Sequence, residues 1–295
     1  MAILKIAVLA ILVAGCELAR DPVTIDLERY ELMVHSVLEA GSDTVAVLLT
    51  RVVVEGDSVA PSAQPVSGAT VRITGGGESV LLGEASAGFP PCLADAGAAG
   101  CYSGIVRGGV RAGETYALDV RVPGGEEARG SARVPLAPVV EAPAAGSRIG
   151  VRRKPERVPA ATVPVRWRGA GDAGRIGVRL VLRTLYPRTL DLPFTSCTIP
   201  QNTLLRSPGT DTATLVLHRP ALCHTPGGPV EPDSIGADIL VVAYDSAYAR
   251  YEELVRTYPG KPLQRNRFAA GVTGALGVFA AVARAEREIV LVPVD

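Results

Sequence analysis

The chain has 295 residues, 47% of them hydrophobic, with 30 Lys plus Arg against 30 Asp plus Glu and a formal net charge of +0 at pH 7. This length and composition allow a sizeable core, and the balanced charge excludes a global electrostatic attraction to nucleic acid. The 32 Gly and 23 Pro, with only 4% aromatic residues, favour many short strands and turns over helices.

The first sixteen residues, MAILKIAVLAILVAGC, have the order of a secretory signal, with a lysine, a short apolar run and then small residues. The run is shorter than the about 20 residues that span a bilayer, so we expect a signal peptide over 1–15. The ending Val13-Ala14-Gly15-Cys16 resembles a bacterial lipobox, which implies a lipidated Cys16 at the start of a tether over 16–25. An ordinary signal peptide with an incidental cysteine is the alternative.

The residue after Cys16 is Glu17. In proteobacterial lipoproteins an Asp at this place often signals retention in the inner membrane, so Glu17 favours the outer membrane. Several acyl chains on one cysteine hold a protein stably where one chain does not. We therefore expect a protein of the cell envelope that is anchored by lipid to the outer membrane.

The four cysteines beyond Cys16 favour an oxidising compartment, because an even number in an exported chain indicates disulfides. We expect Cys92–Cys101 and Cys197–Cys223, since each pair falls within one expected domain and closes a loop rich in Pro or Gly. Free buried thiols are the alternative. The spacings lack a CxxC pattern and the chain has only three histidines, so no metal site is predicted.

Alternating apolar and polar residues predict about seven strands over 26–135, the number found in an immunoglobulin-like sandwich. In chain order, these strands are expected over 30–38, 44–55, 65–73, 80–84, 102–106, 113–123 and 127–134.

A segment rich in Pro and Ala over 136–146 is the expected linker, and a second sandwich is expected over 147–295. The stretch around Trp167 resembles the Trp-bearing strand of fibronectin type III domains, which implies a buried Trp167. One helix is expected over 246–258, because Asp245 can cap it and Pro259-Gly260 can end it. The strands are expected over 162–171, 176–185, 212–218, 235–244, 278–282 and 288–292.

The catalytic motifs GxSxG and HExxH, the P-loop and the EF-hand loop do not occur in the sequence. The glycine run over 271–277 lacks the spacing of a dinucleotide fingerprint and indicates a strand that bends or packs tightly. His224 follows Cys223, but a disulfide-bonded cysteine cannot act as a nucleophile. We expect no catalytic residue, no enzyme activity and no cofactor.

Candidate binding residues come from the expected helix and loops. Tyr248 and Tyr251 lie with Tyr244 roughly on one helical face, where they could grip a partner, although docking of the helix on the sheet is the commoner role. The loops at the two expected disulfides are further candidates. The segment 148–188 holds eleven basic and two acidic residues and could face anionic head groups or lipopolysaccharide phosphates, although arginines pointing outwards from alternating strands are the simpler and favoured explanation.

Several stretches together resemble a known family. Pro65-Val-Ser-Gly-Ala-Thr-Val-Arg-Ile73 and Gly113-Glu-Thr-Tyr-Ala-Leu-Asp-Val120 are similar to strands of the prealbumin-like sandwich of carboxypeptidase regulatory domains. Together with the lipobox, the exit Val134-Pro135 and the ending Gly274-Ala-Leu-Gly-Val-Phe279, they make the chain resemble the DUF4249 lipoproteins of Bacteroidetes over nearly its full length. Ala275 departs from the glycine usual in that family.

The resemblance implies architecture and location rather than chemistry, because the family has no established activity. It also implies a TonB-dependent transporter as partner. We therefore expect a mostly β protein with an immunoglobulin- or prealbumin-like sandwich, then a fibronectin-III-like sandwich with one helix, acting as a non-catalytic binding module. An envelope polymer hydrolase and a structural adhesin are the alternatives.

Overall fold

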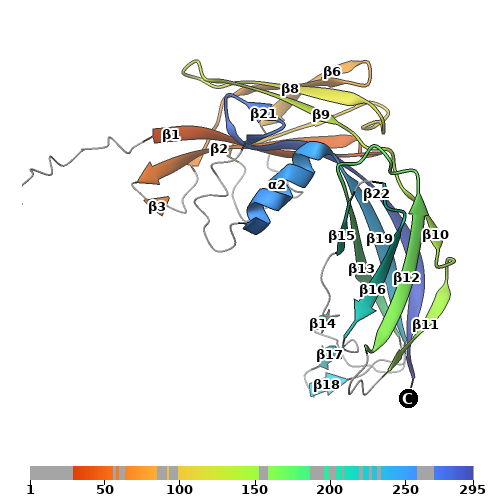
Figure 1. The fold of residues 1–295 in the computed structure, drawn as a ribbon. Helices are drawn as coiled ribbons and strands as arrows, with labels where there is room; N and C mark the ends of the chain where they lie inside the picture. Colours follow the sequence, from red (N-terminus) through yellow and green to blue (C-terminus); the bar gives the residue numbers. More distant parts are fainter. Residues whose placement is uncertain are drawn as a thin grey trace, which may run out of the picture.

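The computed structural model describes residues 29–55, 58–59, 64–84, 92, 99–152, 159–186, 196–198, 204–207, 209–218, 222–225, 228–230, 234–257 and 269–294. Within these ranges the fold is mostly β, with a single α-helix and sheets packed face to face in open sandwiches (Figure 1). The expected fold class, mostly β with sandwich architecture, is confirmed.

The strands of the first half are β1 (Arg29–Glu39), β2 (Thr44–Glu55), β3 (Ser58–Val59), β4 (Gln64–Pro65), β5 (Thr70–Gly75), β6 (Glu78–Glu84), β7 (Cys101–Ile105), β8 (Thr115–Arg121) and β9 (Glu127–Arg133). Further along the chain are β10 (Val139–Ala142), β11 (Ser147–Arg152), β12 (Ala161–Arg168), β13 (Arg175–Tyr186), β14 (Ser196–Thr198), β15 (Leu204–Arg206), β16 (Thr212–Leu217), β17 (Leu222–Thr225), β18 (Gly228–Val230) and β19 (Ser234–Tyr244). The helix α2 (Ser246–Thr257), β20 (Ala269–Ala270), β21 (Val272–Thr273) and β22 (Leu276–Val294) follow.

Most expected elements agree with these bounds to within a few residues, but two regions differ. The expected linker 136–146 contains β10, which pairs with β12. The expected strand pair over 278–282 and 288–292 is one continuous strand, β22. Between the two expected strands, Arg284 and Glu286 alternate with Ala283 and Ala285, as on a strand with one polar face.

A long sheet runs through both halves in the order β15-β13-β19-β22-β1-β2-β7-β6-β5-β8-β9-β21. Its central strand is β22. Residues 276–282 of β22 pair in parallel with β1, and residues 282–291 pair antiparallel with β19. Residues 289–294 also pair in parallel with β11. The last described strand therefore joins the two halves of the molecule.

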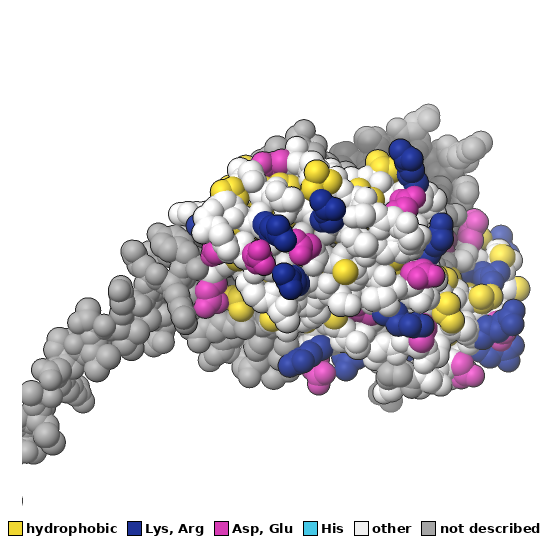
Figure 2. Space-filling view, turned by 90° about the horizontal axis from the view of Figure 1, so that it is seen from above, with side chains coloured by type: hydrophobic (Ala, Val, Ile, Leu, Met, Phe, Trp, Pro, Cys, Tyr) yellow, Lys and Arg dark blue, Asp and Glu magenta, His cyan; other side chains and the backbone are white. Residues whose placement is uncertain are grey.

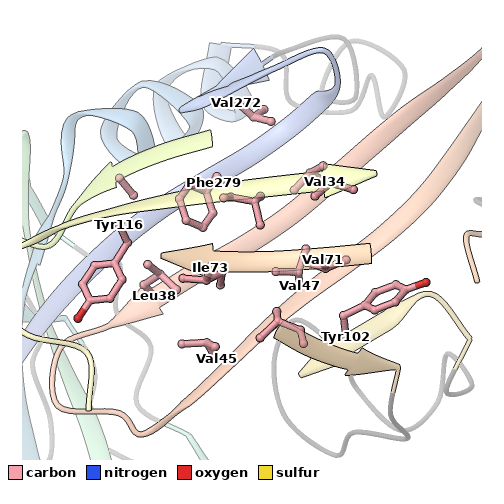
Figure 3. Packing of buried hydrophobic residues seen from close by; sticks show 14 of the residues in the cluster. Val34, Leu38, Val45, Val47, Val71, Ile73, Tyr102, Tyr116, Val272 and Phe279 are labelled. Atoms are coloured by element: carbon pink, nitrogen blue, oxygen red, sulfur yellow. The ribbon is translucent and has the colours of Figure 1, made fainter. Parts of the chain in front are cut away.

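Both large hydrophobic cores of the described residues lie on the same face of β22, the face that carries its odd-numbered side chains. Phe279 packs in the first core, under the layer of β5, β8 and β9 (Figure 3). Ile289 and Leu291 pack in the second core, under the sheet β10-β12-β16, which also buries Trp167. β22 contributes side chains to both cores. It therefore connects the two expected domains, 26–135 and 147–295.

Gly277 permits the close approach of β22 to β1. Its φ is +98°, and a Cβ at this position would collide with the carbonyl oxygen of Val34, its partner in the parallel pairing. A Cβ at Gly271, where φ is +69°, would collide in the same way with the carbonyl oxygen of Phe279. The glycine run 271–277 therefore serves tight packing, as the sequence indicates.

The variant Gly277→Ala is expected to lower the free energy of unfolding by more than about 1 kcal/mol, because it combines a strained φ with a backbone collision. Gly83→Ala is the control, since Gly83 lies in β6 and a Cβ there meets nothing within 4 Å. Urea unfolding followed by far-UV circular dichroism measures both variants. Equal stability of the two variants would contradict this account of the strand contact.

Candidate functional site

The long sheet has a second face, opposite to the two cores. Side chains on this face alternate with core residues along each strand. Among the described elements only α2 lies on it, packed against β20 and β22 in the inner corner between the two halves (Figure 1). We call this surface the open face; its central side chains are His35, Val37, Glu39, Thr44, Ala46, Arg179, Leu240, Val242, Tyr244, Val282 and Arg284.

A hollow of about 720 Å³ lies on the open face beside α2. The strand register assembles it, because Val282 of β22 pairs with Tyr244 of β19 on one side and with Glu39 of β1 on the other. Its lining joins apolar, aromatic and charged side chains from both halves of the chain: His35, Val37, Glu39, Ser42, Thr44, Ala46, Arg179, Leu240, Val242, Tyr244, Tyr248, Val282 and Arg284.

The two candidate tyrosines dock the helix onto the sheet. Tyr248 and Tyr251 are partly buried and pack with Ala247 against a small cluster on β20 and β22. Tyr248 also stacks on Tyr244 with ring centroids 4.7 Å apart, and this pair lines the hollow. The Tyr251 ring contacts His35 edge-on at 6.1 Å. Docking, which the sequence left open as the commoner role, is therefore observed for both residues.

Burial sets the ionisation of the two polar aromatic groups at the helix. It raises the pKa of Tyr248 above its ordinary value, and the nearby Glu252 raises this pKa further. Burial also lowers the pKa of His35 below its ordinary value. At neutral pH both side chains are therefore uncharged, and the fixed charges of the hollow come from Arg and Glu.

Those charges are only partly paired. Glu39 and Arg284 form an ion pair at 2.5 Å, and Arg284 also lies 4.0 Å from Glu286. Arg179, which is exposed on β13, makes no ion pair with any residue in the described ranges. Among the described residues the hollow therefore presents one guanidinium, that of Arg179, without a counter-ion.

Asp245 ties α2 to β22. It is buried; its Oδ1 accepts a hydrogen bond from the backbone N–H of Tyr248 at 2.7 Å, and its Oδ2 accepts one from the N–H of Ala281 at 3.0 Å. The first bond is the helix cap expected from the sequence. Burial raises the pKa of Asp245 to about 6, although these hydrogen bonds oppose the rise. Capping and docking account for this buried carboxyl group.

The disulfide Cys92–Cys101 is confirmed, with the two Cα atoms 5.8 Å apart. It packs beside Ala46 and Leu48 on the continuation of the open face. Strands β14 and β17 pair in a register that sets Cys197 directly opposite Cys223. The side chains of that second pair lie outside the described set, so their disulfide stays a prediction. Cys16 lies outside the described residues as well.

The basic segment 148–188 does not form one described surface. On β12 the outward-facing Arg166 and Arg168 both pair with Glu141 at 3.2 Å, and on β13 Arg175 pairs with Glu253 of the helix at 3.8 Å. Arginines of this segment thus project from alternating positions on several strands, as in the simpler of the two expectations.

The outer surface of the first half is also a mixture of charges. Figure 2 shows acidic and basic side chains interspersed on it. On β8 and β9, Arg121 and Arg129 each lie within 3.7 Å of carboxylate oxygens from both Asp119 and Glu127. Exposed pairs of this kind contribute little to stability and neutralise each other, so this surface offers no field of one sign.

The described part of the chain has neither a metal-binding group of side chains nor a membrane-spanning helix. It contains no group of three or more His, Cys, Asp or Glu placed to hold a metal ion. Its helix lacks the length and hydropathy that crossing a membrane requires.

Sequence reasoning missed most of the hollow. The alternation of arginine and apolar residues along β13 is a signal that places Arg179 on one face of its strand, but β19 is buried along nearly its whole length and gives no such signal for Val242. Arg179 and Val242 lie near His35 and Glu39 because β1 pairs in parallel with β22, and no local sequence pattern predicts that pairing.

The raised pKa of Asp245 predicts a pH-dependent stability. The neutral carboxyl is favoured on folding, so this contribution is full below the ordinary pKa of 3.8 and is lost as pH rises through about 6. The stability of the protein relative to Asp245→Asn should therefore fall by up to roughly 3 kcal/mol between pH 3.5 and pH 7. Urea unfolding of both proteins across this range measures the difference, and a difference that grows with pH would refute the assignment.

Comparison with curated proteins gives no match. Among solved structures, the chain is similar to the adhesin InvE of Yersinia pseudotuberculosis, with 17% identity and a TM-score of 0.20, covering 72% of this chain and 56% of that one. It is also similar to the FN1–FN3 domains of chicken CNTN1, with 11% identity and a TM-score of 0.17, covering 86% of this chain and 64% of that one. The chain thus spans less than two thirds of either structure, and scores this low support no argument about function.

The family model described as a domain of unknown function, DUF4249, matches residues 20–172. This range contains the strands around 65–73 and 113–123 that carry the resemblance in sequence, and it stops short of the ending at 274–279. The match covers more than half of the chain. The chain therefore belongs to the DUF4249 family.

Proposed function

We propose that this protein is a lipid-anchored binding module of the cell envelope that performs no catalysis. The observation that carries the proposal is the open face, a sheet surface with a hollow of about 720 Å³ built from both halves of the chain. Rigid strands hold its side chains in place, which lowers the entropy that a partner must remove on binding.

Exposed apolar side chains extend this surface beyond the hollow. Ile105 on β7 is 58% exposed and pairs with Thr44, which lines the hollow. Leu81 on β6 is 61% exposed and lies two residues along from Gly83, which pairs with Ser103. Large apolar side chains beside a concavity are typical of contact sites for other molecules.

The ionisable side chains of the hollow favour binding over acid–base chemistry. Glu39 is held by Arg284, and His35 is half-buried against the ring of Tyr251. A general acid or base needs a proton that it can exchange with a substrate. Side chains with these contacts are better suited to shaping a surface.

The proposed location rests on the sequence. The signal residues 1–15 and the lipobox ending at Cys16 support a lipid anchor, and Glu17 supports the outer membrane. Membership of DUF4249 adds the proposal that the first half is prealbumin-like and that the partner is a TonB-dependent transporter. The second half is proposed to be fibronectin-III-like.

The variant Cys16→Ser tests the anchor. Without the cysteine there is no thiol to carry acyl chains, so the protein should leave the membrane fraction or accumulate as the unprocessed precursor. Fractionation and immunoblotting of cells that produce each form measure the outcome. Normal processing with an unchanged membrane fraction would refute lipidation at Cys16.

The variant Ile105→Asp tests the open face as the partner surface. A charge in the apolar contact should reduce recovery of a TonB-dependent transporter from detergent-solubilised membranes by about tenfold or more. Val139→Asp is the control, because Val139 is 47% exposed but lies on β10, away from the open face. Affinity capture with quantitative mass spectrometry compares the two.

Two results would count against the proposed function. Equal transporter recovery with both variants would remove the open face as the site. Turnover of an envelope glycan or peptide by the purified protein would replace the binding module with the hydrolase alternative.

A further inference from the structure

We propose that the hollow of the open face binds a small monoanionic molecule with an apolar body, and that Arg179 pairs with its anionic group. This inference rests on the proposed function, since it assigns a ligand class to the same surface. It concerns a small molecule, which the hollow can hold beside a protein partner at Ile105.

The size and the lining of the hollow fit a small molecule. Its volume of about 720 Å³ falls within the roughly 300–1,000 Å³ that small-molecule sites occupy. Val37 and Val282 supply partly exposed apolar surface from the neighbouring strands β1 and β22, beside Leu240 and Val242, which are buried. Burying an apolar body against them gains about 25 cal/mol for each Å² removed from water.

Arg179 selects an anion. On β13 it pairs with Leu240 of β19, and both residues line the hollow. Arg284, the other cation of the lining, is already held by Glu39. A guanidinium without a counter-ion offers a planar fork of donors that matches a carboxylate in two parallel hydrogen bonds.

The same contacts limit the ligand to one charge and disfavour a sugar. Within the described lining only Arg179 lacks an ion pair with another described residue, and one such guanidinium cannot compensate a polyanion, whose binding requires several phosphate contacts. Sugars bind proteins by stacking on exposed aromatic faces, but Tyr248 covers one face of the Tyr244 ring at 4.7 Å. The Tyr244 ring also lies against Gly177, where a Cβ would meet it at 2.7 Å.

Calorimetric titration of the full chain in lipid nanodiscs tests the ligand class, with empty nanodiscs as the reference. The probes are 2-naphthoate, its neutral amide 2-naphthamide, and octanoate. We expect saturable binding of a carboxylate, with the amide at least tenfold weaker. Preference for naphthoate or for octanoate identifies an aromatic or an aliphatic body.

The variant Arg179→Gln tests the assigned residue. It should weaken binding of the preferred carboxylate about tenfold and leave the affinity for the amide unchanged. Arg148→Gln is the matched control, because Arg148 is an exposed arginine of β11 outside the hollow and should bind like the unaltered protein. Arg179→Lys keeps the charge without the fork and should bind with intermediate affinity.

Three results would overturn the inference: no saturable binding of either carboxylate, equal affinity for acid and amide, or equal loss in the Arg179 and Arg148 variants. Measuring transporter capture with the same preparations distinguishes failure of this inference from failure of the proposed function. Capture that persists while carboxylate binding is absent refutes the ligand class alone, whereas loss of both refutes the open face as a binding surface.

Discussion

The fold depends on the two pairings of β22. Its first part pairs in parallel with β1, and its later part pairs antiparallel with β19, so one strand continues the sheet of each half into the other. The odd-numbered side chains of β22 close the first core through Phe279 and the second through Ile289. Removing this strand would open both cores at once, since neither half has another strand in that position.

The same arrangement explains why one face of the long sheet stays open. Both covering layers, one of β5, β8 and β9 and the other of β10, β12 and β16, pack on the core side. The opposite side receives α2, which Asp245 fixes to β22 near Ala281. The hollow lies beside the helix, and most of its described lining belongs to strands.

Local patterns predicted the strands well where burial alternates strictly. The stretch 113–123 and the Trp167 strand show this, because a buried core on one side enforces a period of two. The prediction of two separate strands over 278–282 and 288–292 was wrong. Arg284 and Glu286 lie on the open face of one continuous strand, where charged side chains are tolerated. The hollow was beyond prediction, because it depends on which strands become neighbours, and the parallel contact of β1 with β22 has no local signature.

The parallel pairing of β1 with β22 also governs the order in which the protein can fold. β1 pairs with β22, and the first core contains both Val34 and Phe279, which lie near opposite ends of the described chain. Such non-local contacts carry a large loop-closure entropy and slow the folding reaction. Residues 29–134 therefore cannot complete their core until Val272, Phe279 and Ala281 have been synthesised. Until then β1 lacks its partner along the edge that pairs with β22, and unpaired strand edges of this kind favour aggregation during folding.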